Sequence, residues 1–345
     1  EYLLALHASG SAVTHTGWTP RFMLLWAGSE LIAACPLYLK SHSFGEYVFD
    51  WAWANAHAEH GLPYYPKLVG AIPYTPVASP RLLLAPDQPR PRETARALID
   101  FVLEESRCRQ LSSIHWLFPA PSDLEPLLER GFMPRLGCQF HWHNRGYRDF
   151  QDFLDTFTAK RRKNINRERR LVREAQWATV HDFYRSTFHR LGGEPTLTLP
   201  FFQELAPTLE DRILLVLAFA GDRAVAGAIS FRDATTLYGR HWGCRADYDS
   251  LHFEACYYQG LEYCIHHGLR RFEPGAQGEH KIYRGFMPAL THSTHWIADP
   301  GFRRAIADFL GREAPAVRDY ARQLLQHSPY RDEVTPDAPA VAGSA

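Results

Sequence analysis

The most concentrated charge in this sequence is a basic run that could bind phosphate groups. Residues 160–170 read KRRKNINRERR, in which seven of eleven side chains are basic and one is acidic. In a helix, Lys163, Arg167 and Arg170 would share one face at i, i+4 and i+7. Arginine matches phosphate oxygens through two parallel N–H groups, and like charge at this density repels itself without an anion. The run indicates a phosphate site, with a solvated helix face as the alternative.

A loop after a predicted strand gathers a second set of reactive side chains. Residues 269–273 predict the strand, and residues 273–284 read EPGAQGEHKIYR. In α/β sheets ligands gather beyond the carboxyl ends of the strands, where this loop would lie. Its glycines permit backbone conformations that other residues avoid. The loop is interpreted as part of a functional site rather than as a simple connection. Its polar residues are Gln277, Glu279, His280, Lys281 and Arg284.

A third candidate is the strand predicted over residues 237–244, LYGRHWGC. Strict alternation places Tyr238, Arg240 and Trp242 on one face and the two glycines on the other. Glycine in a strand interior marks a place where a ligand or another backbone approaches closely. Ordinary sheet packing around a buried cation is the alternative.

Histidines alternate in the segment 139–144, QFHWHN, where Gln139, His141 and His143 would share a face. Two histidines on one strand could begin a metal site. However, no third ligand stands at a recognisable spacing, and the HExxH pattern is absent. Hydrogen-bonded, partly buried histidines are therefore favoured, and no metal site is predicted.

A pentapeptide, RGFMP, occurs identically at residues 130–134 and 284–288. Similar predicted elements precede each copy: a hairpin, a helix and a short strand. The ranges are 22–39, 95–103 and 114–118 in the first half, and 213–231, 253–265 and 269–273 in the second. A predicted terminal strand follows each copy. This order indicates a duplication with mixed sheets and covered faces, which is α/β architecture.

Composition excludes several classes of protein. At 345 residues, with 46% hydrophobic side chains, the chain is long enough for two packed domains. Its 38 basic and 38 acidic residues cancel, so a polyanion must meet a local patch. The longest apolar run, residues 213–221, is far shorter than the roughly 20 residues that span a bilayer. We therefore expect no integral membrane contact. The six cysteines form no CxxC pair, which favours a reducing compartment, and we expect a cytoplasmic protein.

Several long segments together resemble one bacterial family. They include HSFGEYVFDWAWA, YYPKL, QFHWHNRGYRDFQDFL, RRKNINRER, LYGRHWGC and LHFEACYYQGLEYCIHHGLRRFEPGAQGEHKIYRGFMP. The resemblance is to predicted N-acyltransferases of the peptidoglycan biosynthesis or recognition type, which are similar to Fem-type enzymes of the GNAT superfamily. It implies tandem GNAT-like domains with mixed sheets flanked by helices, over residues 1–148, with an aromatic insertion at 41–92, and 149–313, before a tail at 314–345.

The resemblance also implies an activity. Fem-type enzymes transfer an amino acid from aminoacyl-tRNA to an amine of a peptidoglycan precursor, and GNAT enzymes transfer acyl groups from CoA. Both donors carry phosphates, and neither transfer uses a permanently bound cofactor. The R/QxxGxG/A pyrophosphate loop of ordinary GNAT enzymes is absent here, which disfavours simple acetyl-CoA use.

Direct attack by an amine on an ester or thioester needs a proton acceptor and donors for the developing oxyanion. His280 and Glu279 are the candidate bases, and Lys281, Arg240 and Tyr238 the candidate donors to phosphate or carbonyl. Predicted substrate contacts are Arg162, Lys163, Arg167, His141, His143, Trp242, Glu254, Gln277 and Arg284.

Three alternatives stay open at this point. The first is a cell-wall sugar or peptide binding protein without catalysis, which would use Trp51, Trp53, Tyr64 and Tyr65. The second is a nucleic-acid-binding protein, whose affinity would depend steeply on salt. The third is a histidine-ligated metalloenzyme.

Overall fold

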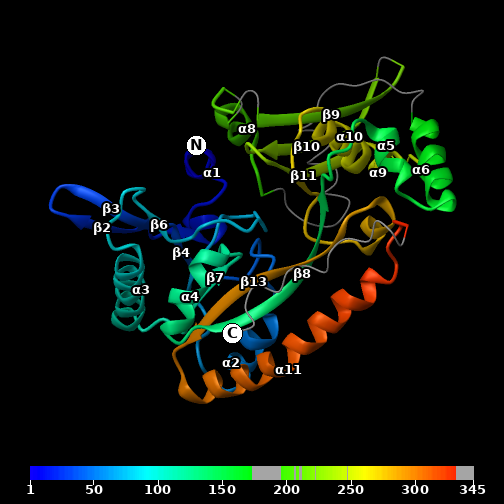
Figure 1. Cartoon of the computed structure of the whole chain (residues 1–345). Helices are drawn as coiled ribbons and strands as arrows, with labels where there is room; N and C mark the ends of the chain where they lie inside the picture. Colours follow the sequence, from blue (N-terminus) through cyan, green and yellow to red (C-terminus); the bar gives the residue numbers. More distant parts are fainter. Residues whose placement is uncertain (173–195, 206, 210–211, 222, 247, 332–345) are drawn as a thin grey trace. The chain divides into compact units, whose positions relative to one another are not determined.

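The computed structural model describes residues 1–172, 196–205, 207–209, 212–221, 223–246 and 248–331, and the chain divides into two compact units (Figure 1). The N-terminal unit comprises Leu6–Cys138 and Leu290–Tyr320. The C-terminal unit comprises Glu1–Ala5, Gln139–Ala289 and the described residues from Ala321 onward. Strands β8 (Met133–His143) and β13 (Met287–Ile297) each contribute residues to both units.

The N-terminal unit contains a mixed sheet and a small antiparallel one. The mixed sheet has the order β1-β4-β5-β7-β13, and only the β5–β7 pair is parallel. Its strands are β1 (Trp18–Pro20), β4 (Leu37–Lys40), β5 (Lys67–Gly70), β7 (Ser113–Leu117) and part of β13. The small sheet has the order β2-β3-β6, with β2 (Met23–Ala27), β3 (Glu30–Cys35) and β6 (Leu83–Leu84).

Helices accompany these sheets, and one packs its apolar stripe into the main core. They are the 3₁₀ turn Thr14–Thr16, α2 (Trp51–Glu59), α3 (Pro91–Cys108) and α4 (Pro121–Glu129). Helices α1 (Tyr2–Ala8) and α11 (Pro300–Leu325) contribute residues to both units. Leu98, Ile99 and Val102 of α3 are fully buried against Trp116 of β7. The predicted helix at 95–103 is confirmed, because its apolar residues recur at helical spacing.

The predicted hairpin at residues 22–39 is divided by a proline. Its first strand is β2, and the Gly28–Ser29 turn is confirmed, with Gly28 at φ +63°. Its second strand is interrupted at Pro36, which separates β3 from β4. Because proline has no N–H to donate to the ladder, the two strands join different sheets.

The C-terminal unit carries a run of five neighbouring strands, in the order β8-β12-β11-β10-β9. Strands β9, β10 and β11 form an antiparallel meander, β11 and β12 run parallel, and β12 pairs with β8 antiparallel. The strands are β9 (Ile213–Ala220), β10 (Arg223–Arg232), β11 (Thr236–Cys244), β12 (Arg271–Glu273) and the end of β8. The helices are α5 (Phe150–Asp155), α6 (Ala159–Val172), α8 (Leu199–Leu205), α9 (Leu251–Phe253), a π-helix (Glu254–Tyr258), α10 (Gln259–His266) and a 3₁₀ helix (Glu279–Arg284).

The duplicated order of elements is confirmed. Each half contains a hairpin, a helix, a strand, RGFMP and a terminal strand in that order. The glycines of the two RGFMP copies, Gly131 and Gly285, adopt φ values of +80° and +92°. Only glycine takes this left-handed conformation without strain, so the repeated turn explains part of the repeated sequence. The α/β class with mixed sheets is confirmed as well.

The last predicted range begins inside a helix. The sequence places a tail at 314–345, whereas α11 continues to Leu325, with Ala321 and Leu324 buried. Alanine and arginine favour the helix strongly enough to continue past Pro315. Residues 332–345 lie outside the described part of the chain, and the ranges 1–148 and 149–313 stay predictions.

Candidate functional site

A cavity opens in the C-terminal unit where two parallel strands separate. Strand β11 pairs with β12 over Thr236–Tyr238 and Arg271–Glu273, and the pairing then stops. Beyond it a cavity of about 260 Å³ is lined by β10, by β11, by residues 274–277, 280 and 281, and by the π-helix with His252 of α9 before it. The cavity is at the carboxyl ends of both strands, where the functional loop was predicted. Its polar and aromatic lining residues are Ser230, Arg240, His241, Trp242, His252, Cys256, Tyr257, Gln277, His280 and Lys281.

One wall of the cavity is a bulge in β11. Ile229 pairs with His241 and Ser230 with Gly239, so Arg240 is an extra residue without an opposite partner position. The predicted strict alternation of Tyr238, Arg240 and Trp242 is therefore wrong across this point. Arg240 and Trp242 line the cavity, whereas Tyr238 donates to Asp233 Oδ2 at 2.7 Å.

The close backbone approach predicted at the strand glycines is confirmed at Gly239. A Cβ atom there would lie 3.1 Å from the Cα atom of Pro274. Glycine thus allows the loop that follows β12 to cross directly beside β11.

Lys281 is the buried cation of the site. It is 2% exposed, and its Nζ donates to the carbonyl oxygen of Gly275 at 2.7 Å. Burial lowers the pKa of its amino group to about 8. Near neutral pH the ammonium form still dominates, and it is held by a neutral carbonyl rather than by a carboxylate.

His280 lies beside Lys281 and can accept a proton. Its Nε2 is 2.8 Å from the hydroxyl oxygen of Tyr257, which comes from the π-helix. Burial lowers the pKa of His280 below its usual value, and Arg284 and Lys281 add to this, so the imidazole is neutral at pH 7. A Cβ on Gly278, at φ +112°, would lie 2.5 Å from the His280 ring. Glu279 and Gln277 are exposed, and of the two Gln277 lines the cavity.

Sequence reasoning missed His252 as a lining residue. Its ring centroid lies 5.4 Å from that of Trp242 and 5.3 Å from that of Tyr257. Burial, followed by the charges of His280 and Lys281, lowers the pKa of His252 to about 4. His252 lies in α9, just before the π-helix, and Cys256, four residues later, also lines the cavity. This i, i+4 spacing and the family-like segment LHFEACYY were the available signals.

The basic run forms the predicted helix, α6. Lys163 and Arg167 are exposed on it, and Ile165 is buried as expected. Arg162 donates to the carbonyl of Phe157 at 2.9 Å. The side chain of Arg170, which was predicted to share their face, lies outside the described residues.

Another arginine of this helix is buried in ion pairs. Arg169 contacts Glu254 at 3.2 Å and Glu262 at 2.7 Å, and its guanidinium lies 4.3 Å from the Phe150 ring centroid. Glu254, predicted to bind substrate, is 2% exposed and also accepts from Gln259 at 2.7 Å. These contacts fasten α6 to the π-helix and α10.

Arg284, another predicted substrate contact, is likewise engaged within the protein. Its Nη2 donates to Glu168 Oε1 at 2.7 Å, and its Nη1 donates to the carbonyl of His280 at 2.9 Å. Its guanidinium carbon lies 3.4 Å from the centroid of the Phe253 ring.

The two histidines of β8 lie outside the set that lines the cavity. His141 Nε2 is 3.3 Å from Gln139 Oε1, and burial lowers the pKa of His141 to about 3. His143 is exposed opposite Arg271. Glu273, which sequence reasoning did not single out, is 4.0 Å from His141, and burial raises its pKa to about 7 despite Arg271. Among the described residues, histidine, cysteine and carboxylate side chains nowhere gather in threes as metal ligands do.

The aromatic residues behind the sugar-binding alternative are mostly core residues of the N-terminal unit. Trp53 is 5% exposed and packs edge-to-face on His295 at 4.9 Å. Tyr64 is buried, and its hydroxyl donates to Asp50 at 2.6 Å. Of these three only Trp51 is exposed, and Tyr65 is half-buried. Phe44, Tyr47 and Phe49 of the same insertion are exposed as well.

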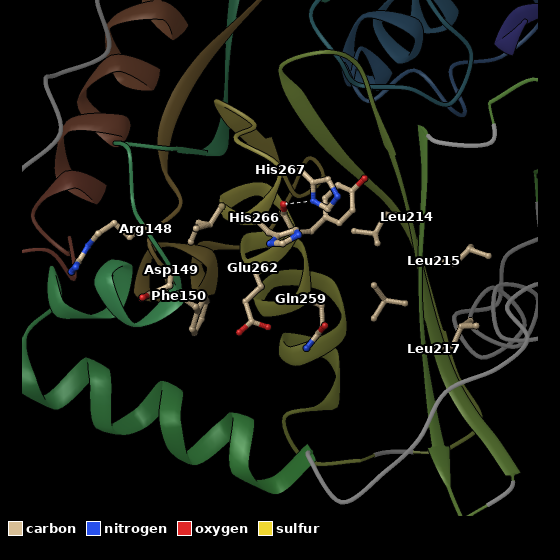
Figure 2. A pocket seen from close by; sticks show the side chains of 13 residues that line it. Arg148, Asp149, Phe150, Leu214, Leu215, Leu217, Gln259, Glu262, His266 and His267 are labelled. Atoms are coloured by element: carbon tan, nitrogen blue, oxygen red, sulfur yellow. Dashed lines mark hydrogen bonds between the residues drawn. The ribbon is translucent and has the colours of Figure 1, made fainter.

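The C-terminal unit also contains a wider cleft, of about 650 Å³. Figure 2 shows leucines of β9 on one side, Glu262 and Gln259 of α10 in the middle, and Arg148 and Asp149 opposite. In this view Nδ1 of His267 donates to the carbonyl oxygen of Tyr263, in its own helical turn, at 2.9 Å. The cleft contains none of the predicted catalytic side chains, so the smaller cavity is the better candidate.

Comparisons with known proteins agree with this architecture. The model of the FemAB-like family, described as peptidoglycan biosynthesis/recognition, matches residues 1–332. The crystal structure of FemX is similar at 12% identity, with a TM-score of 0.51 over 85% of this chain and 92% of that one. An L-PGS from Bacillus licheniformis gives 12% identity, 90% and 96% coverage and a TM-score of 0.49. A tandem GNAT protein from the clavulanic acid biosynthesis pathway is 13% identical, with a TM-score of 0.46 over 82% of this chain and 84% of that one.

No curated protein matches the sequence significantly. Within the described residues, no helix has both the length and the apolar character required to cross a bilayer. The likeness to FemX and the two mixed sheets confirm the tandem GNAT-like α/β fold. The match over residues 1–332 shows that this protein belongs to the FemAB-like family, described as peptidoglycan biosynthesis/recognition.

Proposed function

We propose that this protein transfers an acyl or aminoacyl group from a phosphate-bearing carrier, either acyl-CoA or aminoacyl-tRNA, to an amine. The observation that carries the proposal is the buried ammonium of Lys281 in a cavity between separated parallel strands. Among the described residues this ammonium donates to the Gly275 carbonyl, and such a group is well suited to a developing oxyanion.

The size of the cavity limits what can enter it. About 260 Å³ is smaller than the usual site of a drug-sized ligand, so the acyl group and the adjoining part of its carrier fit but the whole carrier does not. The phosphates would then lie outside. Helix α6 packs against α9 and the π-helix, and its exposed Lys163 and Arg167 offer the positive charge to hold them.

The neighbouring side chains support direct attack on the carbonyl carbon. A lysine ammonium has three N–H donors, and one of them is used by Gly275, so Lys281 can also donate to the substrate carbonyl. The neutral His280 imidazole would take the proton of the attacking amine. The new C–N bond forms as the bond from the acyl carbon to the carrier's sulfur or oxygen breaks. The leaving atom takes a proton from Lys281, whose pKa of about 8 suits this transfer.

Incubation of the protein with charged tRNA and, in a separate arm, with acyl-CoA in the presence of candidate amines would test the proposal. Mass spectrometry should find one donor deacylated and one amine acylated. Lys281→Gln should slow this transfer by about 100-fold or more, since one oxyanion donor is worth that much. Arg223→Gln, at an exposed position of β10 outside the cavity and the basic helix, is the control and should retain activity. Full activity of Lys281→Gln, or ligand binding without turnover in every arm, would contradict the proposal.

A further inference from the structure

We infer that Glu168 on the basic helix α6 is a positioning residue for the His280–Lys281 segment and that it acts through Arg284. The inference rests on the proposed function in one respect, namely that Lys281 is the group whose position matters. Glu168 and its contacts lie in the C-terminal unit, and the sequence did not indicate a role for this residue.

Glu168 is held by two donors from different elements. Its Oε1 accepts from Arg284 Nη2 at 2.7 Å, and its Oε2 accepts from the hydroxyl of Tyr258 at the end of the π-helix. The Arg284 side chain is 8% exposed and that of Glu168 is 21% exposed. Loss of one member of such a pair leaves the other charge poorly solvated, so the pair strongly constrains where Arg284 lies.

Arg284 in turn fixes the backbone beside Lys281. Its Nη1 donates to the His280 carbonyl at 2.9 Å, and its guanidinium stacks on Phe253 at 3.4 Å. Charge-assisted hydrogen bonds of this kind are stronger than neutral ones. The guanidinium thus links Glu168 to the peptide that joins His280 to Lys281, and the last turn of the 3₁₀ helix cannot shift without breaking one of these contacts.

The duplicated pentapeptide offers an internal comparison. Arg130, the counterpart of Arg284, pairs with Asp100 through bonds of 2.6 and 2.8 Å. That pair is at the surface, with side chains 31% and 52% exposed, where ion pairs contribute little. The same RGFMP turn therefore carries an exposed arginine in one half and, in the other, a buried arginine tied to the candidate site.

Two further contacts attach α6 to the same elements. Arg161 lies 3.9 Å from the ring centroid of Tyr283, which is adjacent to Arg284. Arg169 pairs with Glu254 of the π-helix. The helix with exposed cations is therefore bound both to the 3₁₀ helix bearing Lys281 and to the π-helix bearing Tyr257, and Glu168 is its direct contact with Arg284.

The test compares Glu168→Gln, which keeps the size of the side chain but removes its charge, with Asp100→Asn, which removes the matching carboxylate from the first copy. The direct readout is the pH dependence of Lys281 acetylation by acetic anhydride, followed by peptide mass spectrometry with exposed Lys160 as the reference in the same chain. Wild type should show half-maximal reactivity near pH 8. Glu168→Gln should raise this midpoint by about one pH unit or more, because a displaced Lys281 regains water. Asp100→Asn should leave it unchanged.

Transfer kinetics provide the second readout. In Glu168→Gln, kcat should fall about tenfold or more while the donor KM changes less than about threefold. A displaced Lys281 slows the transfer step but does not weaken binding of the donor. Should Glu168→Gln fail to fold in a thermal unfolding assay, Glu168→Asp keeps the charge but is too short to hold both donors, and the same shifts are expected. An unchanged Lys281 midpoint with unchanged kcat in a folded variant would overturn the inference. Absence of transfer in the wild type would count against the proposed function alone, because the acetylation arm still decides the role of Glu168.

Discussion

Replacing Lys281 by leucine should make the protein more stable and inactive at the same time. The repeat suggests this substitution, because alignment of the two RGFMP copies places Leu127 at the position of Lys281. Leu127 is fully buried, so the first half fills the equivalent position with an apolar side chain. Lys281 is almost as buried but charged, and in the described part of the chain it pairs with no carboxylate, so its charge is costly there.

The lowered pKa of Lys281 gives the size of this cost. Its amino group titrates at about 8 in the folded protein, against 10.5 ordinarily. At 1.36 kcal/mol for each pH unit, the folded state loses about 3 kcal/mol wherever the group is charged in both states. Leucine removes that cost but leaves the Gly275 carbonyl without its donor, which costs about 1 kcal/mol. The expected net gain at pH 7 is therefore about 2 kcal/mol.

The sign of the effect depends on pH. Below pH 8 the ammonium is present in the folded and unfolded states, so burial of the charge lowers the stability of the folded state by its full amount. As pH rises from 8 to 10.5 the folded group is already neutral, and the cost declines to nothing. Lys281→Leu should therefore be more stable than wild type at pH 7 and no more stable near pH 11. Lys160→Leu, at an exposed position, should show no such pH-dependent difference.

Urea unfolding monitored by tryptophan fluorescence at pH 7 and at high pH measures these differences, and the acyl-transfer assay measures activity in the same preparations. We expect transfer to fall by about 100-fold or more in Lys281→Leu. A variant that is less stable at pH 7, or whose stability difference does not change with pH, would refute the claim that Lys281 is a buried cation kept for its chemistry.

Three other perturbations have definite expected results. Gly278→Ala should lower kcat by about tenfold, because its φ of +112° is strained for alanine and the new Cβ would press on the His280 ring; a normal kcat would exclude His280 from the reaction. Lys163→Ala combined with Arg167→Ala should raise the donor KM and flatten its dependence on salt while kcat stays constant; an unchanged salt dependence would place the donor phosphates elsewhere. The pH–rate profile should stay high down to below pH 6.5, because the pKa of His280 is lowered, and should fall above about pH 8 as Lys281 loses its proton; a profile still rising at pH 9 would contradict both roles.

The sequence predicted the elements of this fold well where local chemistry determines them. The RGFMP turns need glycine at positive φ, and the helix containing Leu98 and Val102 shows its apolar stripe in the sequence. The strand before the loop at residues 273–284 was also predicted, and the function of that loop stays a prediction. These features depend on neighbours in the chain, and one sequence contains that information.

Features that depend on distant partners were not predictable in the same way. The bulge at Arg240 arises from its register with β10, and nothing in LYGRHWGC requires it. The π-helix at Glu254–Tyr258 has no residue signature of its own. Glu254 was expected to contact substrate, but its contacts in the fold are Arg169 and Gln259, about 85 residues and five residues away in the chain.

The two halves show how a duplicated unit can acquire chemistry without changing its turn. In both copies the turn glycine has the same left-handed conformation, so the backbone requirement is shared. The difference lies just before it: the first copy ends an α-helix with Leu127 in the core, whereas the second forms a 3₁₀ helix with Lys281 beside a cavity. A 3₁₀ helix has three residues per turn, which changes the direction of the side chains that precede the shared turn. Since a buried leucine stabilises and a buried unpaired lysine destabilises, the lysine would be retained only where its charge acts on a ligand.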